Sequence, residues 1–121
     1  MSIVRAELAP EFMLGDDVVL LAMDGAGIAT FVAALREAEQ HGTSQLHLGD
    51  VTHEFHILAD EADVDLGDTR VVWRLDAAKV VEIIENLDVL SCSDRPGHQY
   101  VDITKPTDTL VLSRDEYVRT S

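Results

Sequence analysis

The chain has 121 residues, a common length for one folded domain. Its 46% hydrophobic and 26% charged residues are typical of a globular protein, and a content of 7 Gly, 3 Pro and 1 Cys excludes collagen-like and disulfide-scaffold chains. The net charge of -14 argues against nucleic-acid binding, because contact with phosphates requires clustered Lys and Arg.

The N-terminal part of the chain predicts two strands and no targeting or membrane segment. Residues 2–8 alternate between apolar and polar side chains, and residues 17–23 are almost wholly apolar, as in the central strand of a sheet. No apolar core of a signal peptide follows Arg5, and no run is long enough to span a bilayer. We therefore expect a cytoplasmic protein.

Two segments have the periodicity of amphipathic helices. The first places Ile28, Phe31, Val32 and Leu35 on one face, with Asp24 as the expected N-cap and Gly42 as the expected stop. The second, between residues 76 and 87, has the same spacing in its apolar residues, which are Val80, Ile83, Ile84 and Leu87. Each helix is expected to bury one face against a sheet.

The remaining segments predict strands and suggest an internal repeat. Short alternating runs occupy residues 45–48, 54–58, 69–75, 98–103 and 109–113. Residues 17–59 and 69–113 then share the layout strand–helix–strand–strand within one domain of residues 1–121. The predicted fold class is α+β, with one antiparallel or mixed curved sheet and both helices packed on one of its faces.

A cluster of acidic residues joins the two halves. We interpret it as an exposed loop that offers a contact to a basic partner, and its candidate partner-binding residues are Asp60, Glu61, Asp63, Asp65 and Asp68. An EF-hand is excluded, because its sixth and twelfth positions would be Leu66 and Val72 instead of Gly and Glu.

The side of the predicted sheet that faces away from the helices is a second candidate surface. By alternation it carries polar and aromatic residues of types that are common in interfaces. The candidate partner-binding residues there are His47, His56, Arg70, Arg74, His98, Tyr100 and Asp102, accompanied by Arg5, Glu7, Gln45 and Glu54. As an alternative, His47, His56 and His98 could serve a small ligand or a metal ion.

Motifs for catalysis are missing from the sequence. Gly25-Ala26-Gly27 opens a helix after a strand, but Thr30 stands where the dinucleotide-binding pattern requires Gly. Cys92 is the only cysteine, and neither HExxH nor GxSxG occurs. We expect no catalytic residue, no metal ligand and no cofactor.

In size, acidity and layout the chain resembles the small acidic immunity proteins of bacterial polymorphic-toxin systems. The stretches GHQYVDI (97–103) and TLVLSRDEY (109–117) carry this resemblance. It implies a non-enzymatic protein that masks a toxin, and acidic patches suit this role because they steer a basic partner into contact. A structural homo-oligomer, such as a homodimer, and a small His-based ligand- or metal-binding protein are the alternatives.

Overall fold

The computed structural model describes residues 3–13, 15–93 and 95–115, which form two helices and two four-stranded sheets. The elements are β1 (Val4–Met13), β2 (Asp16–Met23), α1 (Gly25–His41), β3 (Thr43–Leu48), β4 (Val51–Ile57), β5 (Ala62–Leu66), β6 (Arg70–Leu75), α2 (Ala77–Ser91), β7 (Gly97–Asp102) and β8 (Thr109–Arg114). The predicted α+β class with mixed strand pairing is confirmed. The strands form two sheets, however, where the sequence suggested one.

The order of the elements is strand–strand–helix–strand–strand, and it occurs twice along the chain. Sheet A has the order β1-β2-β8-β7 and sheet B has the order β3-β4-β6-β5. Each sheet contains two strands from each half of the chain. The halves are joined by parallel pairs, β2 with β8 in sheet A and β4 with β6 in sheet B. Neither half therefore completes a sheet without the other.

The stretch that was interpreted as an acidic loop contains strand β5, so that interpretation was wrong. β5 pairs antiparallel with β6, as β1 pairs with β2. Its apolar residues Ala62, Val64 and Leu66 belong to the core or pack against it, while Asp63 and Asp65 point to the other side. Only the flanking residues, which include Asp60 and Asp68, lie in connections.

The helices begin at the predicted caps. The side chain of Asp24 accepts a hydrogen bond from the backbone N–H of Gly27, and Asp76 does the same for Lys79. Gly42 ends α1 in the left-handed conformation, with φ of 84°, which costs glycine little because it has no Cβ. Neither helix of the described residues is long and apolar enough to cross a membrane.

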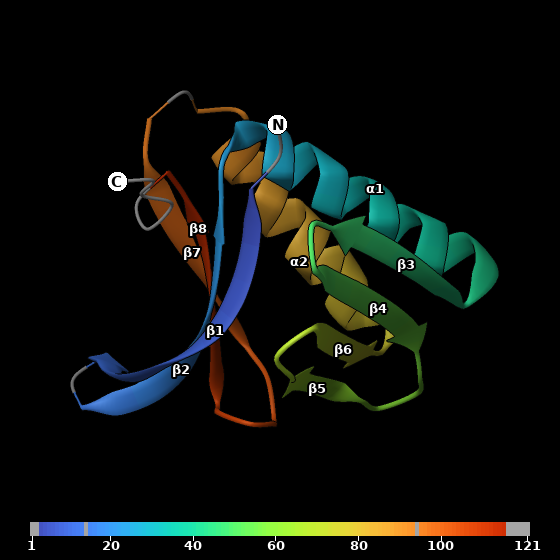
Figure 1. Ribbon diagram of the computed structural model, residues 1–121, viewed down its shortest axis with the longest axis horizontal. Helices are drawn as coiled ribbons and strands as arrows, with labels where there is room; N and C mark the ends of the chain where they lie inside the picture. The colour runs from blue at the N-terminus through green and yellow to red at the C-terminus, as the bar shows by residue number, and fades with distance from the viewer. Residues whose placement is uncertain (1–2, 14, 94, 116–121) are drawn as a thin grey trace.

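One apolar core joins both sheets to both helices. α1 packs against α2, β3 and β4, and α2 packs against β7 and β8, so the helix pair lies beside both sheets (Figure 1). The largest buried side chains include Trp73, Phe31 and Phe55. The inner faces of the two sheets are therefore buried, and a partner could contact the sheets only at their outer faces and edges.

The outer faces of the two sheets differ in chemistry. On sheet A the central strands carry a second buried apolar cluster, formed by Val18, Leu20, Ala22 and Val111. At the corresponding places of sheet B the residues facing outward include Glu54, Arg70 and Arg74. A charged face is stable only in contact with water or a polar partner, so sheet B is the one built for exposure.

Candidate functional site

The outer face of sheet B brings together most of the predicted surface residues. Cross-strand pairs place Gln45 beside Glu54, His56 beside Arg74, and Arg74 beside Asp63. The outward residues on the four strands are Thr43, Gln45, His47, Thr52, Glu54, His56, Arg70, Val72, Arg74, Asp63 and Asp65. We call this set the polar face.

A hydrogen-bonded cluster lies at the centre of the polar face. Glu54 is 8% exposed, and its carboxylate accepts hydrogen bonds from the guanidinium of Arg70 and, at 3.3 Å, from Nε2 of His56. The hydrogen bond from Arg70 is the main reason that the pKa of Glu54 lies below its ordinary value. The side chain of Arg70 remains 62% exposed, so an anchored guanidinium faces the solvent.

Replacing Arg70 with alanine is expected to raise the pKa of Glu54, because the variant loses the hydrogen bond and the positive charge that lower it. An NMR titration of the Glu54 side-chain carboxyl carbon measures this change directly. Arg74→Ala is the matched control. It also removes an arginine from β6, but Arg74 pairs with Asp65 and not with Glu54. An equal pKa in the wild type and in Arg70→Ala would contradict the described contact.

The two acidic residues of β5 have partners within the molecule. Oδ2 of Asp65 lies 3.7 Å from Nη2 of Arg74, and Asp63 accepts a 2.6 Å hydrogen bond from the hydroxyl of Thr104, which lowers the pKa of Asp63. Part of the predicted acidic contact is therefore neutralised internally. Asp60 and Asp68 are exposed, and Glu61 is half-buried, beside the polar face.

His98, Tyr100 and Asp102 lie on sheet A, away from the polar face. They occupy the edge strand β7, where the rings of His98 and Tyr100 meet edge to face with centroids 5.2 Å apart. The single recognition face expected from alternation is therefore divided between two sheets. His98 also lies on a different sheet from His47 and His56, and the described residues contain no group of three His, Cys, Asp or Glu side chains able to hold a metal.

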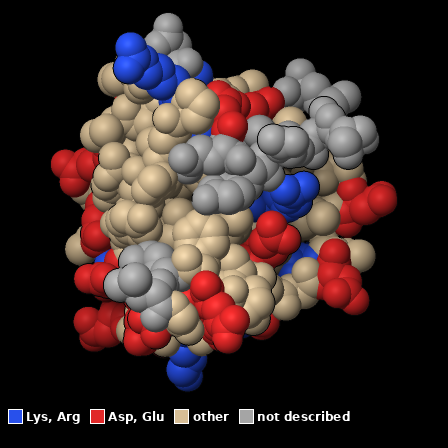
Figure 2. Space-filling model, turned by 90° about the vertical axis from the view of Figure 1, so that its left-hand side faces the viewer, with Lys and Arg blue, Asp and Glu red and all other residues tan. Residues whose placement is uncertain are grey.

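A further set of acidic side chains meets at one end of sheet A. Glu11, Asp16, Asp17, Asp102 and Asp108 lie where β1 and β7 end and β2 and β8 begin. Acidic side chains also gather along the lower part of the side of the molecule shown in Figure 2. The local sequence could not predict that these acidic residues lie near one another, because they come from separate hairpins.

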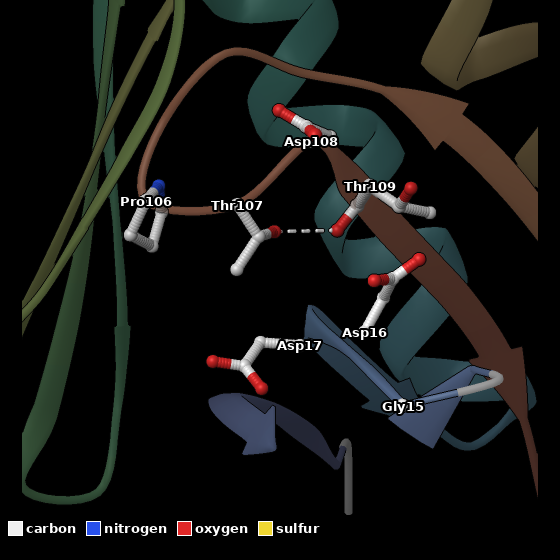
Figure 3. Close-up of a pocket in the computed structure, with 7 residues that line it drawn as sticks. All are labelled: Gly15, Asp16, Asp17, Pro106, Thr107, Asp108 and Thr109. Atoms are coloured by element: carbon white, nitrogen blue, oxygen red, sulfur yellow. Dashed lines mark hydrogen bonds between the residues drawn. The ribbon is translucent and has the colours of Figure 1, made fainter. Parts of the chain in front are cut away.

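A pocket of about 430 Å³ opens within this acidic end. Figure 3 shows the carboxylates of Asp16, Asp17 and Asp108 around it, with the hydroxyl of Thr107 donating a 2.8 Å hydrogen bond to the carbonyl oxygen of Thr109. Asp17 also accepts a hydrogen bond from the backbone N–H of Glu11. The pocket can attract positive charge, but in the part of the chain that the structure describes its carboxylates do not form a group of three able to hold a metal ion.

Comparison with known proteins shows a likeness in fold alone. No family model matches the chain, and no curated protein matches it. Among solved structures it is similar to the crystal structure of Drosophila Suppressor of Fused, with a TM-score of 0.51 and 11% sequence identity. The similarity covers 96% of this chain and 27% of that chain, so this chain corresponds to about a quarter of the other protein.

Proposed function

We propose that this protein is a non-enzymatic binding module that recognises another protein through the polar face of sheet B. The observation that carries this proposal is the Glu54–Arg70–His56 cluster, because it presents to the solvent a guanidinium that is ion-paired with a buried carboxylate on the neighbouring strand. Arginine, held in place before binding, loses little entropy when it contacts a partner. Arginines of this kind are frequent energetic centres of interfaces.

The charge around the polar face supports a basic partner. Asp50, Asp60 and Asp68 are exposed in the connections at the ends of the strands, and the whole chain carries a net charge of -14. Such a field accelerates the approach of a cation-rich protein and disfavours nucleic acid. The resemblance of residues 97–103 and 109–117 to bacterial immunity proteins extends this proposal to an inhibitor that acts on a basic toxin in the cytoplasm, and the charge is consistent with that role.

Affinity purification from the source cells tests the proposal. Tagged wild-type protein is expected to retain one basic protein, identified by mass spectrometry, whose recovery falls at least about tenfold with Arg70→Ala/Arg74→Ala. His98→Ala is the matched control, because it changes an exposed residue of the other sheet. Circular dichroism establishes that all three proteins are folded.

Three results would overturn the proposal. The first is that the double variant retains the partner as well as the wild type does, and the second is that the partner is lost only with His98→Ala. The third is self-association without any other protein, measured by light scattering, which would favour a homo-oligomer. For the inhibitory role, the captured protein must also lose its activity when the wild type is added.

A further inference from the structure

His53 is a buried titratable residue that the polar face does not use. It lies on β4 next to Glu54, but its ring points into the core and is fully buried, while Glu54 faces outward. The ring stacks on Trp73 and meets Phe31 edge to face, each with centroids 6.2 Å apart. The core therefore contains an imidazole among aromatic rings.

The hydrogen bonds of His53 define its protonation state. Nδ1 lies 3.1 Å from Nε1 of Trp73, and because the indole N–H can only donate, Nδ1 must accept. The single proton of the neutral ring is therefore on Nε2, which is buried without a hydrogen-bond partner among the described residues. A second proton would have to enter at Nδ1, directly opposite the indole N–H.

Among the described residues, none that contacts His53 from α1 or pairs with it across sheet B carries a charge that could stabilise a second proton. The residues that face His53 or lie beside it on the inner surface are Phe31 of α1, Leu46 of β3, Leu66 of β5, and Val71 and Trp73 of β6, and none of them titrates. The charged neighbours Glu54, His56 and Arg70 are on the opposite face of the sheet. An imidazolium here would be both unpaired and desolvated.

We propose that His53 is an acid-sensitive latch: uptake of a proton at Nδ1 breaks its hydrogen bond with Trp73 and opens the packing of α1 on sheet B. The proton comes from the solvent and returns to it, so the opening is reversible. Since β4 carries both His53 and the cluster around Glu54, opening this strand also disturbs the polar face. This last consequence rests on the proposed function, whereas the latch itself does not.

Burial supports this mechanism, because it lowers the pKa of His53 from 6.5 to about 4. A histidine whose pKa is lower in the folded state than in the unfolded state contributes stability above pH 6.5 and loses it as the pH falls toward 4. The acid transition is therefore expected between these two values, above the range in which most carboxylates are protonated.

Acid titration of the full chain, followed by near-ultraviolet circular dichroism of the single tryptophan, tests the latch. The wild type is expected to lose its tryptophan signal reversibly between pH 6.5 and 4. In His53→Gln the side-chain carbonyl can still accept from Trp73 but cannot take up a proton, so the midpoint should fall by about one pH unit. His98→Gln, which removes an exposed histidine from sheet A, should retain the wild-type midpoint.

An unchanged midpoint in His53→Gln would overturn the proposal, because carboxylates would then explain the transition. If that variant does not fold, NMR of the wild-type histidines decides. The proposal requires that the His53 ring has its proton on Nε2 at pH 7 and titrates together with the loss of structure. A His53 ring that titrates near its ordinary pKa while the tryptophan signal persists would refute it.

Discussion

Replacing Phe31 with alanine should lower the free energy of unfolding by about 3–5 kcal/mol. Phe31 is fully buried, and its ring meets those of Phe55 and Trp73 edge to face with centroids 5.1 and 5.3 Å apart. Its removal leaves a cavity where α1 meets sheet B, and the surrounding aromatic rings cannot easily close it. A whole domain is stable by only about 5–15 kcal/mol, so this variant should be close to unfolding at physiological temperature.

Urea denaturation followed by far-ultraviolet circular dichroism measures the change, and Trp73 provides a second signal. Val89→Ala is the control, because Val89 on α2 is 58% exposed and its truncation should alter the free energy of unfolding by less than about 0.5 kcal/mol. A loss below about 1 kcal/mol in Phe31→Ala would show that these rings do not form the centre of the core.

Local features of the fold could be predicted because they depend on neighbouring residues. The spacing of four apolar residues predicted the buried face of α1: Ile28, Phe31 and Leu35 are buried, and Val32 is half-buried against the core. Asp24 and Asp76 cap their helices as expected, because a carboxylate just before an apolar periodic run can accept a hydrogen bond from a backbone N–H of the first helical turn. α2 continues beyond the last predicted apolar residue, Leu87, to Ser91.

Strand β5 was missed although its period-two signal was present. Ala62, Val64 and Leu66 alternate with aspartates, but the high charge of the stretch was read as the mark of a solvated loop. The number of sheets could not be read from the sequence, because alternation shows which residues share a face and not which strands pair. That choice depends on the parallel pairings of β2 with β8 and β4 with β6, which join distant segments.

For the candidate site, as for the fold, the sequence could predict which residues share a sheet face but not which strands lie side by side. Residues of one sheet face, such as His56 and Arg74, were placed together correctly because their strands alternate regularly. Tyr100 was assigned to the same surface only because one sheet was assumed. The acidic pocket was missed altogether, since Asp17 and Asp108 come together only when β2 and β8 pair. The last two residues of the stretch 109–117 lie outside the described residues.

Substituting Gly27 with alanine is expected to destabilise the protein by about 1–3 kcal/mol, although alanine normally favours a helix by about 1 kcal/mol over glycine. A Cβ at this position would overlap the carbonyl oxygen of Ile3, which belongs to the backbone and cannot rotate away. The start of β1 is fixed there, because Asp24 accepts from the N–H of Ile3 and donates its own N–H to that carbonyl. The added methyl group must therefore displace β1 from the beginning of α1.

Deleting residues 1–3 supplies the control for this substitution. In the shortened chain the carbonyl oxygen of Ile3 is gone and only the side-chain carboxylate of Asp24, 3.0 Å from the added Cβ, remains close, so Gly27→Ala should destabilise this chain much less than the full chain. Urea denaturation of the wild type, Gly27→Ala, the shortened chain and the shortened chain with Gly27→Ala gives the coupling energy between the terminus and position 27. A coupling near zero would show that the loss arises within the helix, and that the contact of Ile3 with Gly27 does not fix the first strand against α1.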